Sequence, residues 1–391
     1  MRIGQRQIGV GQSPYIIAEL GVNHDGSVER ALDMTRAAAG AGADAVKLQL
    51  FETDLLMSSA AKLAAYQKAA GETDPVAMLR RLELSIDDMA RIVALAHELD
   101  IHAIVTVFSV ELMEKAQSLA WDAYKIASPD IVHKPLLESL AATGKPMIIS
   151  TGASTIEEVK QAVAWLPTES RPSGSGRHVS PHDRLALLQC VSCYPTPEDR
   201  AELGGIAAIA IATGLPTGYS DHTATHITGR YAVAAGAVML EKHLTYDRRA
   251  VGPDHAVSLE PDLMRRYVLE SRAAIVGRPL SVEHSVRKTS AALGSTGVSV
   301  SKENGRDLAY MLQHVERLKR VLDIEQDVRT VSRQSLTTCR ALPRGHSLRS
   351  EDLTFKRPGT GLLPYRLHDV LGRALTRDVG ADVPLVEEDV S

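Results

Sequence analysis

Short apolar runs alternate with helical stretches along most of this chain of 391 residues. The first unit has an apolar run over 15–20, a helical stretch that begins at Ser27 and stops at Gly42, and a second apolar run over 45–51. Further runs occupy 102–108, 123–127, 146–150 and 185–191, and two more end in 218–223 and 241–243. Eight such strands separated by helices predict a closed parallel (β/α)8 barrel, the TIM-barrel fold.

An open, doubly wound sheet is the alternative arrangement for the same alternation. It favours a glycine-rich dinucleotide-binding loop after the first strand, with the spacing G-x-G-x-x-G. The corresponding segment, Gly21-Val-Asn-His-Asp-Gly26, lacks this spacing. A barrel takes up about 250 residues, which leaves room for a second, smaller unit. Because aromatic residues make up only 4% of the chain, we expect a core of Ala, Val, Leu and Ile.

The alternating pattern ends after Gly277. A linker over 281–332 would contain an amphipathic helix over about 306–325, whose apolar stripe packs either on its own barrel or on another subunit. From Arg333 onward the segments are short and are separated by glycine and proline turns. The predicted domains are therefore a barrel over 1–280, the linker over 281–332 and a small mixed domain over 333–391.

Charge and cysteine content exclude several classes of protein. A net charge of −4 provides no general attraction to nucleic acid or to an anionic membrane, and no apolar run is long enough to span a bilayer. The three cysteines do not form a disulfide framework, which favours a cytoplasmic location. Cys190 and Cys193 form a single C-x-x-C without a second pair, so zinc binding or redox use is not the favoured interpretation.

Two lysines and several serines follow or end the predicted strands, where the chemistry of a (β/α)8 barrel takes place. Lys47 and Lys125 lie in apolar strands, where a charged side chain is costly unless it is paired. They either form salt bridges across the barrel or face a shared anion. Together with the hydroxyls of Ser128, Ser150 and Ser220, the second interpretation predicts a site for a phosphate or carboxylate group.

Two histidines end the last two strands. His222 and His243 are expected at the same level of neighbouring strands, with Asp221 and Glu241 beside them in the sequence. They are either structural residues or ligands of a divalent metal, and two imidazoles completed by oxygen ligands suit Mn²⁺ or Mg²⁺. Asp254, in a following loop, is either a turn former or a base that faces the substrate.

The chain resembles the sialic acid synthase (N-acetylneuraminate synthase) family over nearly its whole length. The matching motifs are Ile17-Ala-Glu-Leu-Gly-Val-Asn-His-Asp-Gly26, Val46-Lys-Leu-Gln49, Ala123-Tyr-Lys-Ile-Ala-Ser128, Ser150-Thr-Gly152, Tyr194-Pro-Thr-Pro197, Gly218-Tyr-Ser-Asp-His-Thr223, Glu241-Lys-His243 and Gly252-Pro-Asp-His255. In the tail, Lys356-Arg-Pro-Gly-Thr-Gly361 and Leu371-Gly372 resemble the family's C-terminal antifreeze-like (SAF) domain.

The resemblance implies an enzyme that condenses phosphoenolpyruvate with an open-chain N-acetylhexosamine such as N-acetylmannosamine. The products would be a nine-carbon 2-keto sugar acid and phosphate, with cleavage of the C–O bond. A related 3-deoxy sugar acid synthase that uses a different or phosphorylated aldose is the second interpretation, and the basic pair Arg248-Arg249 leaves it open. A non-catalytic carbohydrate-binding relative is the third.

The resemblance also implies a role for each residue. Catalysis would rest on Glu19, His222, His243 and Asp254, with Mn²⁺ or Mg²⁺ on the two histidines. Phosphoenolpyruvate would be held by Lys47, Lys125, Ser128, Ser150, Ser192, Tyr194 and Ser220. The sugar would be bound by Gln49, Thr106, Asp130, Glu241 and Arg357.

Arg357 would reach the sugar from the SAF domain of a partner subunit, which implies a domain-swapped homodimer. The chain departs from the family's pattern in three places near the site. It has Val105-Thr-Val-Phe108 after the third strand, Ser128-Pro-Asp130 in place of Ser-Gly-Glu, and Ser192 where some relatives have Asn. These departures bear on the identity of the sugar more than on the reaction.

Overall fold

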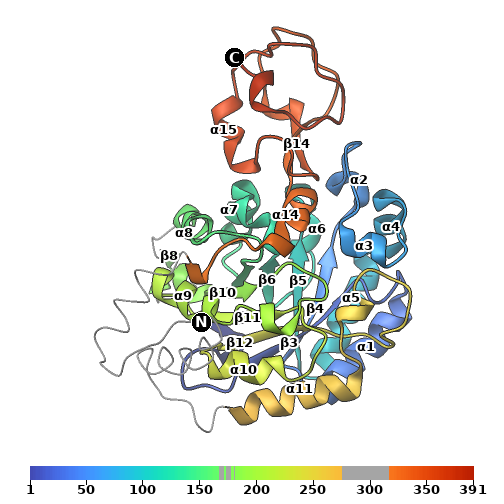
Figure 1. Cartoon of the computed structure of the whole chain (residues 1–391), viewed down its shortest axis with the longest axis vertical. Helices are drawn as coiled ribbons and strands as arrows, with labels where there is room; N and C mark the ends of the chain where they lie inside the picture. The colour runs from blue at the N-terminus through green and yellow to red at the C-terminus, as the bar shows by residue number, and fades with distance from the viewer. Residues whose placement is uncertain (167–170, 173–177, 180, 275–316) are drawn as a thin grey trace.

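The computed structural model describes residues 1–166, 171–172, 178–179, 181–274 and 317–391. Its centre is a closed barrel of parallel strands (Figure 1). The strands are β3 (Tyr15–Gly21), β4 (Ala45–Leu50), β5 (His102–Val107), β6 (Ala123–Ile126), β7 (Met147–Ser150), β10 (Leu185–Cys190), β11 (Thr217–Asp221) and β12 (Met239–His243). They follow one another around the barrel in chain order, and β12 pairs with β3 to close it. The predicted (β/α)8 barrel is confirmed, and the open sheet is excluded.

Helices surround the barrel and connect its strands. They are α1 (Val28–Ala41), α5 (Ile86–Glu98), α6 (Met113–Gln117), α7 (Lys134–Ala142), α8 (Ile156–Trp165), α9 (Gly204–Thr213), α10 (Thr228–Ala234) and α11 (Pro261–Ala273). The predicted caps of α1 are confirmed: the Ser27 side chain accepts a hydrogen bond from the Arg30 amide, and Gly42 ends the helix at a φ of 86°. Ser85 caps α5 in the same way, through the amide of Asp88.

A short N-terminal hairpin closes the barrel at the end opposite the polar strand termini. The hairpin consists of β1 (Arg2–Ile3) and β2 (Arg6–Gln7). Ile3 and Ile8 are buried against inward-facing aliphatic side chains such as Ile17, Ile104 and Ile148. The barrel is therefore a packed core at this end and can hold a ligand only at the other.

An insertion between β4 and α5 forms a wall beside the opposite end of the barrel. It contains α2 (Thr53–Leu56), α3 (Ala65–Ala69) and α4 (Pro75–Leu82). The apolar side chains of α4 pack with Phe51 and Phe108, which lie at the ends of β4 and β5. The insertion is thus fixed to the rim of the barrel.

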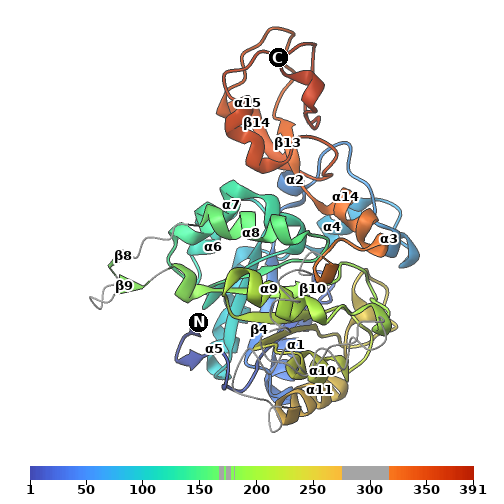
Figure 2. The same cartoon turned by 60° about the vertical axis from the view of Figure 1, so that its left-hand side comes forward.

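The C-terminal residues form a separate small domain above the barrel mouth (Figures 1 and 2). It contains β13 (Ser335–Thr338), β14 (Leu353–Lys356) and α15 (Leu367–Val370) around a core rich in leucine. Preceding it, α14 (Gln326–Ser332) lies between this domain and the barrel. Of the predicted linker over 281–332 and its helix over 306–325, the part up to residue 316 lies outside the described residues. The prediction that the helix continues to residue 325 is wrong, because residues 319–322 are not helical and 323–325 form a 3-10 turn.

The remaining elements are short. They are the hairpin of β8 (Arg171–Pro172) with β9 (His178–Val179), and the 3-10 turns η1 (Val110–Leu112), η2 (Ser128–Val132), η3 (Pro181–Arg184), η4 (Glu198–Arg200), η5 (His255–Val257), η8 (Asp323–Glu325), η9 (Ser350–Asp352), η10 (Pro364–Arg366) and η11 (Glu387–Asp389). Within the described ranges, no helix has the length and apolar character needed to cross a membrane.

Candidate active site

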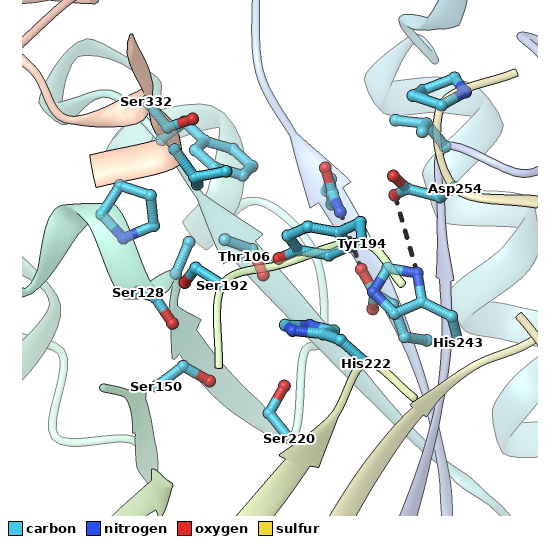
Figure 3. Close-up of a pocket in the computed structure, with 18 of the residues that line it drawn as sticks. Thr106, Ser128, Ser150, Ser192, Tyr194, Ser220, His222, His243, Asp254 and Ser332 are labelled. Carbon is cyan, nitrogen blue, oxygen red and sulfur yellow. Dashed lines mark hydrogen bonds and ion pairs between the residues drawn. The ribbon is translucent and has the colours of Figure 1, made fainter. Parts of the chain in front are cut away.

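A cavity of about 130 Å³ opens at the carboxyl ends of the barrel strands (Figure 3). It is lined by almost every residue that the sequence predicted for the site: Glu19, Lys47, Gln49, Thr106, Lys125, Ser128, Ser150, Ser192, Tyr194, Ser220, His222, Glu241, His243, Asp254 and Arg357. Asp130 is the exception. These side chains come from all eight strands or from the segments that follow them, and from the C-terminal domain.

The register of the strands explains why these residues meet. Ser220 lies opposite Glu241, and two residues further along β12 His243 lies opposite Glu19, so the side chains of each pair lie next to each other on the inner face of the barrel. Because side chains alternate along a strand, the intervening residues point the other way. Asp221 and Lys242, which flank the histidines in the sequence, form a fully buried pair with 3.3 Å between Oδ1 and Nζ, and neither lines the cavity.

A β-bulge in the first barrel strand, β3, lies next to the cavity. The pairing of β3 with β4 shifts register between Glu19 and Gly21, and Gly21 has a φ of 53°. A side chain at position 21 would approach the carboxylate of Glu19 and the amide of Gln49 to 3.2 and 3.3 Å. Glycine at this position therefore leaves room for the polar groups of the site.

The two buried lysines are paired with carboxylates that also line the cavity. Lys47 Nζ lies 3.0 Å from Glu19 Oε2, 3.0 Å from Thr106 Oγ1 and 3.7 Å from Glu241 Oε2. Lys125 Nζ donates to Ser150 Oγ at 2.6 Å and lies 3.8 Å from Glu241 Oε1. The alternatives of a salt bridge and an anion site are thus not exclusive: the lysines have partners and still face the cavity.

The two carboxylates have opposite pKa shifts. Burial raises the pKa of Glu19 and outweighs the attraction of Lys47. Burial acts on Glu241 as well, but Lys125 and Lys47 outweigh it and hold the pKa of Glu241 at about 2. Two carboxylates whose pKa values are pushed apart are suited to different tasks. Glu241 stays ionised as the counter-ion of the lysines, and Glu19 is the group that can exchange a proton.

The two histidines face each other across one side of the cavity. Their ring centroids are 5.6 Å apart. His222 Nδ1 lies 2.8 Å from the carbonyl oxygen of Val191, and donation to that carbonyl leaves Nε2 with its lone pair. Burial and the neighbouring His222 lower the pKa of His243 well below its usual value, so this ring is neutral. Burial acts on His222 in the same way, but Cys190, whose Sγ lies 3.5 Å from His222 Nδ1, outweighs it and raises the pKa of His222. A metal binds the neutral form of an imidazole whose ring is oriented by a second contact.

The donor set fits a metal that takes most of its ligands from water or substrate. Within the described part of the chain, no group of three or more His, Cys, Asp or Glu side chains could hold a metal ion. His243 Nδ1 is buried without a hydrogen bond, 3.7 Å from Asp254 Oδ2 (Figure 3). Two imidazoles with open positions are compatible with the Mn²⁺ or Mg²⁺ of the sequence prediction.

Aromatic rings cover the histidines from above. Tyr194 lies 4.1 Å from the His222 ring, and Tyr66 of α3 stacks on Tyr194 with 4.8 Å between centroids. The sequence predicted Tyr194 but missed Tyr66, because the segment that carries Tyr66 has no strand-end position. The only available signal was the length of the insertion between β4 and α5.

The insertion also contributes to an apolar wall that the sequence analysis missed. It is formed by Val22, Met78, Leu79, Leu82 and Phe108, which are buried in one cluster and line the cavity. Arg357 lies beside this wall, with its guanidinium 5.4 Å from the centre of the Phe108 ring. The helical spacing of Met78, Leu79 and Leu82 indicated that this helix buries one face. It did not indicate that the buried face lines the cavity.

Arg357 reaches the cavity from the C-terminal domain. Its amide donates to the carbonyl of Leu56 at 2.8 Å, and its carbonyl accepts from Ser58 Oγ at 2.7 Å. The backbone of β14 thus continues onto the insertion. The structure describes one chain, and Arg357 lies over the barrel of that chain. Its delivery from a partner subunit stays a prediction.

Asp130 is placed differently from its prediction as a sugar-binding residue. Its side chain is 1% exposed, and Oδ1 accepts from Gln334 Nε2 at 2.9 Å. Gln334 also donates to the carbonyl of Phe108 at 2.8 Å. Burial raises the pKa of Asp130 to about 6, even though Arg357 acts in the opposite direction. Asp130 therefore joins the barrel to the C-terminal domain and does not line the cavity.

We expect Asp130→Asn to stabilise the protein above pH 6. The folded state raises the pKa of this carboxyl above the unfolded value, so ionisation opposes folding, and its cost grows as the pH rises from about 4 to about 6. An amide that keeps an acceptor for Gln334 removes a penalty on the order of 2 kcal/mol at pH 8, and has little effect at pH 4. Thermal unfolding of Asp130→Asn and of the parent protein at both pH values measures this difference in stability. A loss of stability at pH 8, or a large rise in the KM for the sugar, would contradict the placement.

The comparisons with known proteins show the family of this chain. The NeuB family model matches residues 34–277, and the SAF domain model matches residues 333–391. The chain therefore belongs to the NeuB family, as its motifs indicated, and carries a C-terminal SAF domain. The prediction of an enzyme of the sialic acid synthase type is confirmed at this level.

Three relatives cover nearly the whole chain. It is 32% identical to the N,N'-diacetyllegionaminic acid synthase of Legionella pneumophila, over 99% of this chain and 97% of that protein. It is 31% identical to the N-acetylneuraminate-9-phosphate synthase of Drosophila melanogaster, over 96% and 95% of the two chains. The crystal structure of the spore coat polysaccharide biosynthesis protein SpsE of Bacillus subtilis is similar with a TM-score of 0.74, at 27% identity and coverage of 100% and 99%.

Proposed function

We propose that this enzyme condenses phosphoenolpyruvate with the open-chain form of an N-acylated, unphosphorylated aldohexose. The products are a nine-carbon 2-keto sugar acid and inorganic phosphate. The observation that carries the proposal is the meeting of two different groups in one cavity: paired lysines with serine hydroxyls on one side, and two imidazoles beside Asp254 on the other.

The lysine side of the cavity suits phosphoenolpyruvate. Lys125 and Ser150 bond each other, and the hydroxyls of Ser128, Ser192 and Ser220 lie on neighbouring strand ends (Figure 3). The amide of Gly152 donates to Ser128 Oγ at 2.9 Å, and this hydroxyl donates to Cys190 Sγ at 3.6 Å, so Ser128 is held in place at the cavity. Ammonium groups and hydroxyl donors in a buried site are the partners that phosphate and carboxylate oxygens require.

Glu19 and Glu241 have different roles in the proposed reaction. Carbon 3 of phosphoenolpyruvate attacks the aldehyde carbon, and carbon 2 develops positive charge. Water adds to carbon 2, and the C–O bond to phosphate then breaks, so that the keto group forms and phosphate leaves. Glu19, with its raised pKa, accepts the proton of that water, and the ionised Glu241 offsets the charge of Lys47 and Lys125 throughout.

A divalent ion, Mn²⁺ or Mg²⁺, would be held by His222 and His243. When bound, it would supply Lewis-acid polarisation of the aldehyde. Asp254, 3.7 Å from His243, is placed to accept hydrogen bonds from sugar hydroxyls next to that carbonyl. Burial raises the pKa of Asp254 to about 6, opposed by His222, so it is ionised above that pH.

The apolar wall and Arg357 favour an acylated acceptor over a phosphorylated one. Among the described residues that line the cavity, the lysine and arginine side chains are Lys47, Lys125 and Arg357, and both lysines already have carboxylate partners. The basic pair that left a phosphorylated aldose open does not line it. Arg249 is 90% exposed and pairs with Asp247, and Arg248 donates to the carbonyl of Ala256. An acyl carbonyl can bond Arg357 while its methyl group packs on the wall.

We expect Leu79→Ala to reduce the preference for an acylated sugar. Leu79 is 8% exposed and lines the cavity, and its truncation removes apolar contact worth about a tenfold preference for N-acetylmannosamine over mannose. Leu63→Ala is the matched control, because Leu63 is 6% exposed in the same cluster but does not line the cavity. The ratio of the two kcat/KM values measures the effect. An equal change in both variants would contradict the assignment of the wall.

A phosphate-release assay of the purified protein tests the proposed function. Phosphoenolpyruvate and Mn²⁺ are combined with N-acetylmannosamine, its 6-phosphate, mannose or a diacetamido-hexose in turn. We expect phosphate release with the acylated, unphosphorylated sugars, and a product of three more carbons by mass spectrometry. Faster release with the 6-phosphate would support the related 3-deoxy sugar acid synthase, and no release with any acceptor would support a non-catalytic relative.

A further inference from the structure

A buried carboxylate from the C-terminal segment holds together two loops at the barrel mouth. Glu325 is 1% exposed and lies in η8, far from the strands in sequence. Its Oε1 accepts hydrogen bonds from the backbone amides of Ala153 and Ser192, each at 2.7 Å. Its Oε2 accepts from the amide of Leu322 at 2.9 Å, which fixes the side chain on its own segment.

The two amides belong to the loops that follow β7 and β10. Ala153 directly follows the segment Ser150-Thr-Gly152, and Ser192 is itself a cavity residue. The loops touch: a side chain at Gly152 would come within 2.2 Å of Ser192 Oγ and 2.9 Å of Ser128 Oγ. Glu325 thus joins the two loops through their backbone amides, while Ser150 and Ser192 of the same segments line the cavity on the side of the two lysines.

The loop after β7 needs such a support. Ala153 has a φ of 49°, a left-handed conformation that costs a residue with a side chain about 1 kcal/mol or more. Its amide is held by Glu325, and its carbonyl accepts from Arg333 Nη2 at 3.3 Å and from Arg329. Both arginines also pair with Glu158 on α8. The strained residue is therefore fixed by side chains of the segment 325–333.

We infer that Glu325 is a positioning residue for the phosphate-binding side of the site, acting through the amides of Ala153 and Ser192. The inference rests on the proposed function. The charge of the Glu325 carboxylate makes its hydrogen bonds to the two amides stronger than those of a neutral acceptor. Loss of the carboxylate frees the loops that hold Ser150 and Ser192, whereas Arg357 and Asp254, on the sugar side, keep their contacts.

Glu325→Ala should raise the KM for phosphoenolpyruvate at least about tenfold, and change the KM for the sugar less than about threefold, because each charged hydrogen bond contributes more than the equivalent of a tenfold change. Glu325→Gln keeps an acceptor for both amides and should recover most of the affinity. Asp323→Ala is the matched control: Asp323 lies two residues away, its side chain is 77% exposed and pairs with Arg200, and its loss should leave both KM values unchanged. Equal rises in both KM values, or the same effect from Asp323→Ala, would overturn the inference.

Hydrogen exchange separates this inference from the proposed function. In Glu325→Ala, the amides of Ala153 and Ser192 should exchange at least about tenfold faster than in the parent protein, with or without any substrate. If the parent protein neither binds phosphoenolpyruvate in calorimetry nor releases phosphate, the proposed function fails while this measurement still stands. Unchanged exchange at both amides would overturn the structural basis of the inference.

Discussion

His222→Ala is expected to lower the rate of phosphate release at least about a thousandfold, because Lewis-acid stabilisation of the transition state contributes several kcal/mol. The ring of His222 is fixed by the carbonyl of Val191 at 2.8 Å and by Tyr194 at 4.1 Å, and His243 faces it from the next strand. One imidazole alone cannot hold the ion against water. Phosphate release with saturating phosphoenolpyruvate and sugar, at several Mn²⁺ concentrations, measures the loss.

His226→Ala is the matched control for this variant. His226 follows in the same segment, but it pairs with Glu270 at 3.4 Å and does not line the cavity. It should retain both activity and metal binding. Electron paramagnetic resonance of Mn²⁺ titrated into the protein gives a readout that does not depend on turnover. Full activity in His222→Ala, or an unchanged affinity for Mn²⁺, would rule out the metal assignment.

Lys47→Met is expected to abolish activity and to destabilise the protein. Its loss leaves Glu19 with Gln49 as its remaining hydrogen-bond partner, and burial and Glu241 then raise the pKa of Glu19 further. Removing one partner of a buried ion pair costs about 3–5 kcal/mol of the free energy of unfolding. The cavity also loses a cation for the substrate, so we expect kcat/KM for phosphoenolpyruvate to fall at least about a thousandfold.

Lys242→Met separates the loss of stability from the loss of function. Lys242 is also a fully buried lysine on a barrel strand, paired with Asp221 at 3.3 Å, but it points away from the cavity. We expect a similar loss of stability, about 3–5 kcal/mol in urea unfolding, and a kcat/KM within about threefold of the parent at temperatures where the variant is folded. Equal losses of activity in the two lysine variants would show that Lys47 acts only through stability.

The barrel and most of the site could be predicted because strand-end residues have a position that sequence reveals. Once Lys47, Lys125, His222 and His243 are assigned to the ends of parallel strands, closure of the barrel brings them to one end of the barrel, where they line the same cavity. Residues outside the strands could not be placed in this way. Tyr66 and the α4 residues of the apolar wall come from an insertion, and the position of an insertion depends on tertiary packing against Phe51 and Phe108.

The same limit explains why the sequence assigned Asp130 to the wrong role and did not single out Glu325. Asp130 matched a family position for sugar binding, yet the fold turns it toward Gln334 of the C-terminal domain. Glu325 lies in a segment without a recognisable motif, yet it receives two amides from strand-end loops more than a hundred residues away in sequence. A buried carboxylate takes its role from the donors around it, and long-range packing decides which donors those are.

The sequence by itself determined the repeating strands and helices, the residues at the strand ends and the presence of a second domain, since periodicity and local motifs encode them. The tertiary structure decided which side chains at those ends face inward, which carboxylate stays ionised, and how the C-terminal segment supports the lysine side of the cavity. The physical reason is that the pKa of a buried group and the partners of a buried amide depend on atoms brought together by packing, and neighbours along the chain do not specify them.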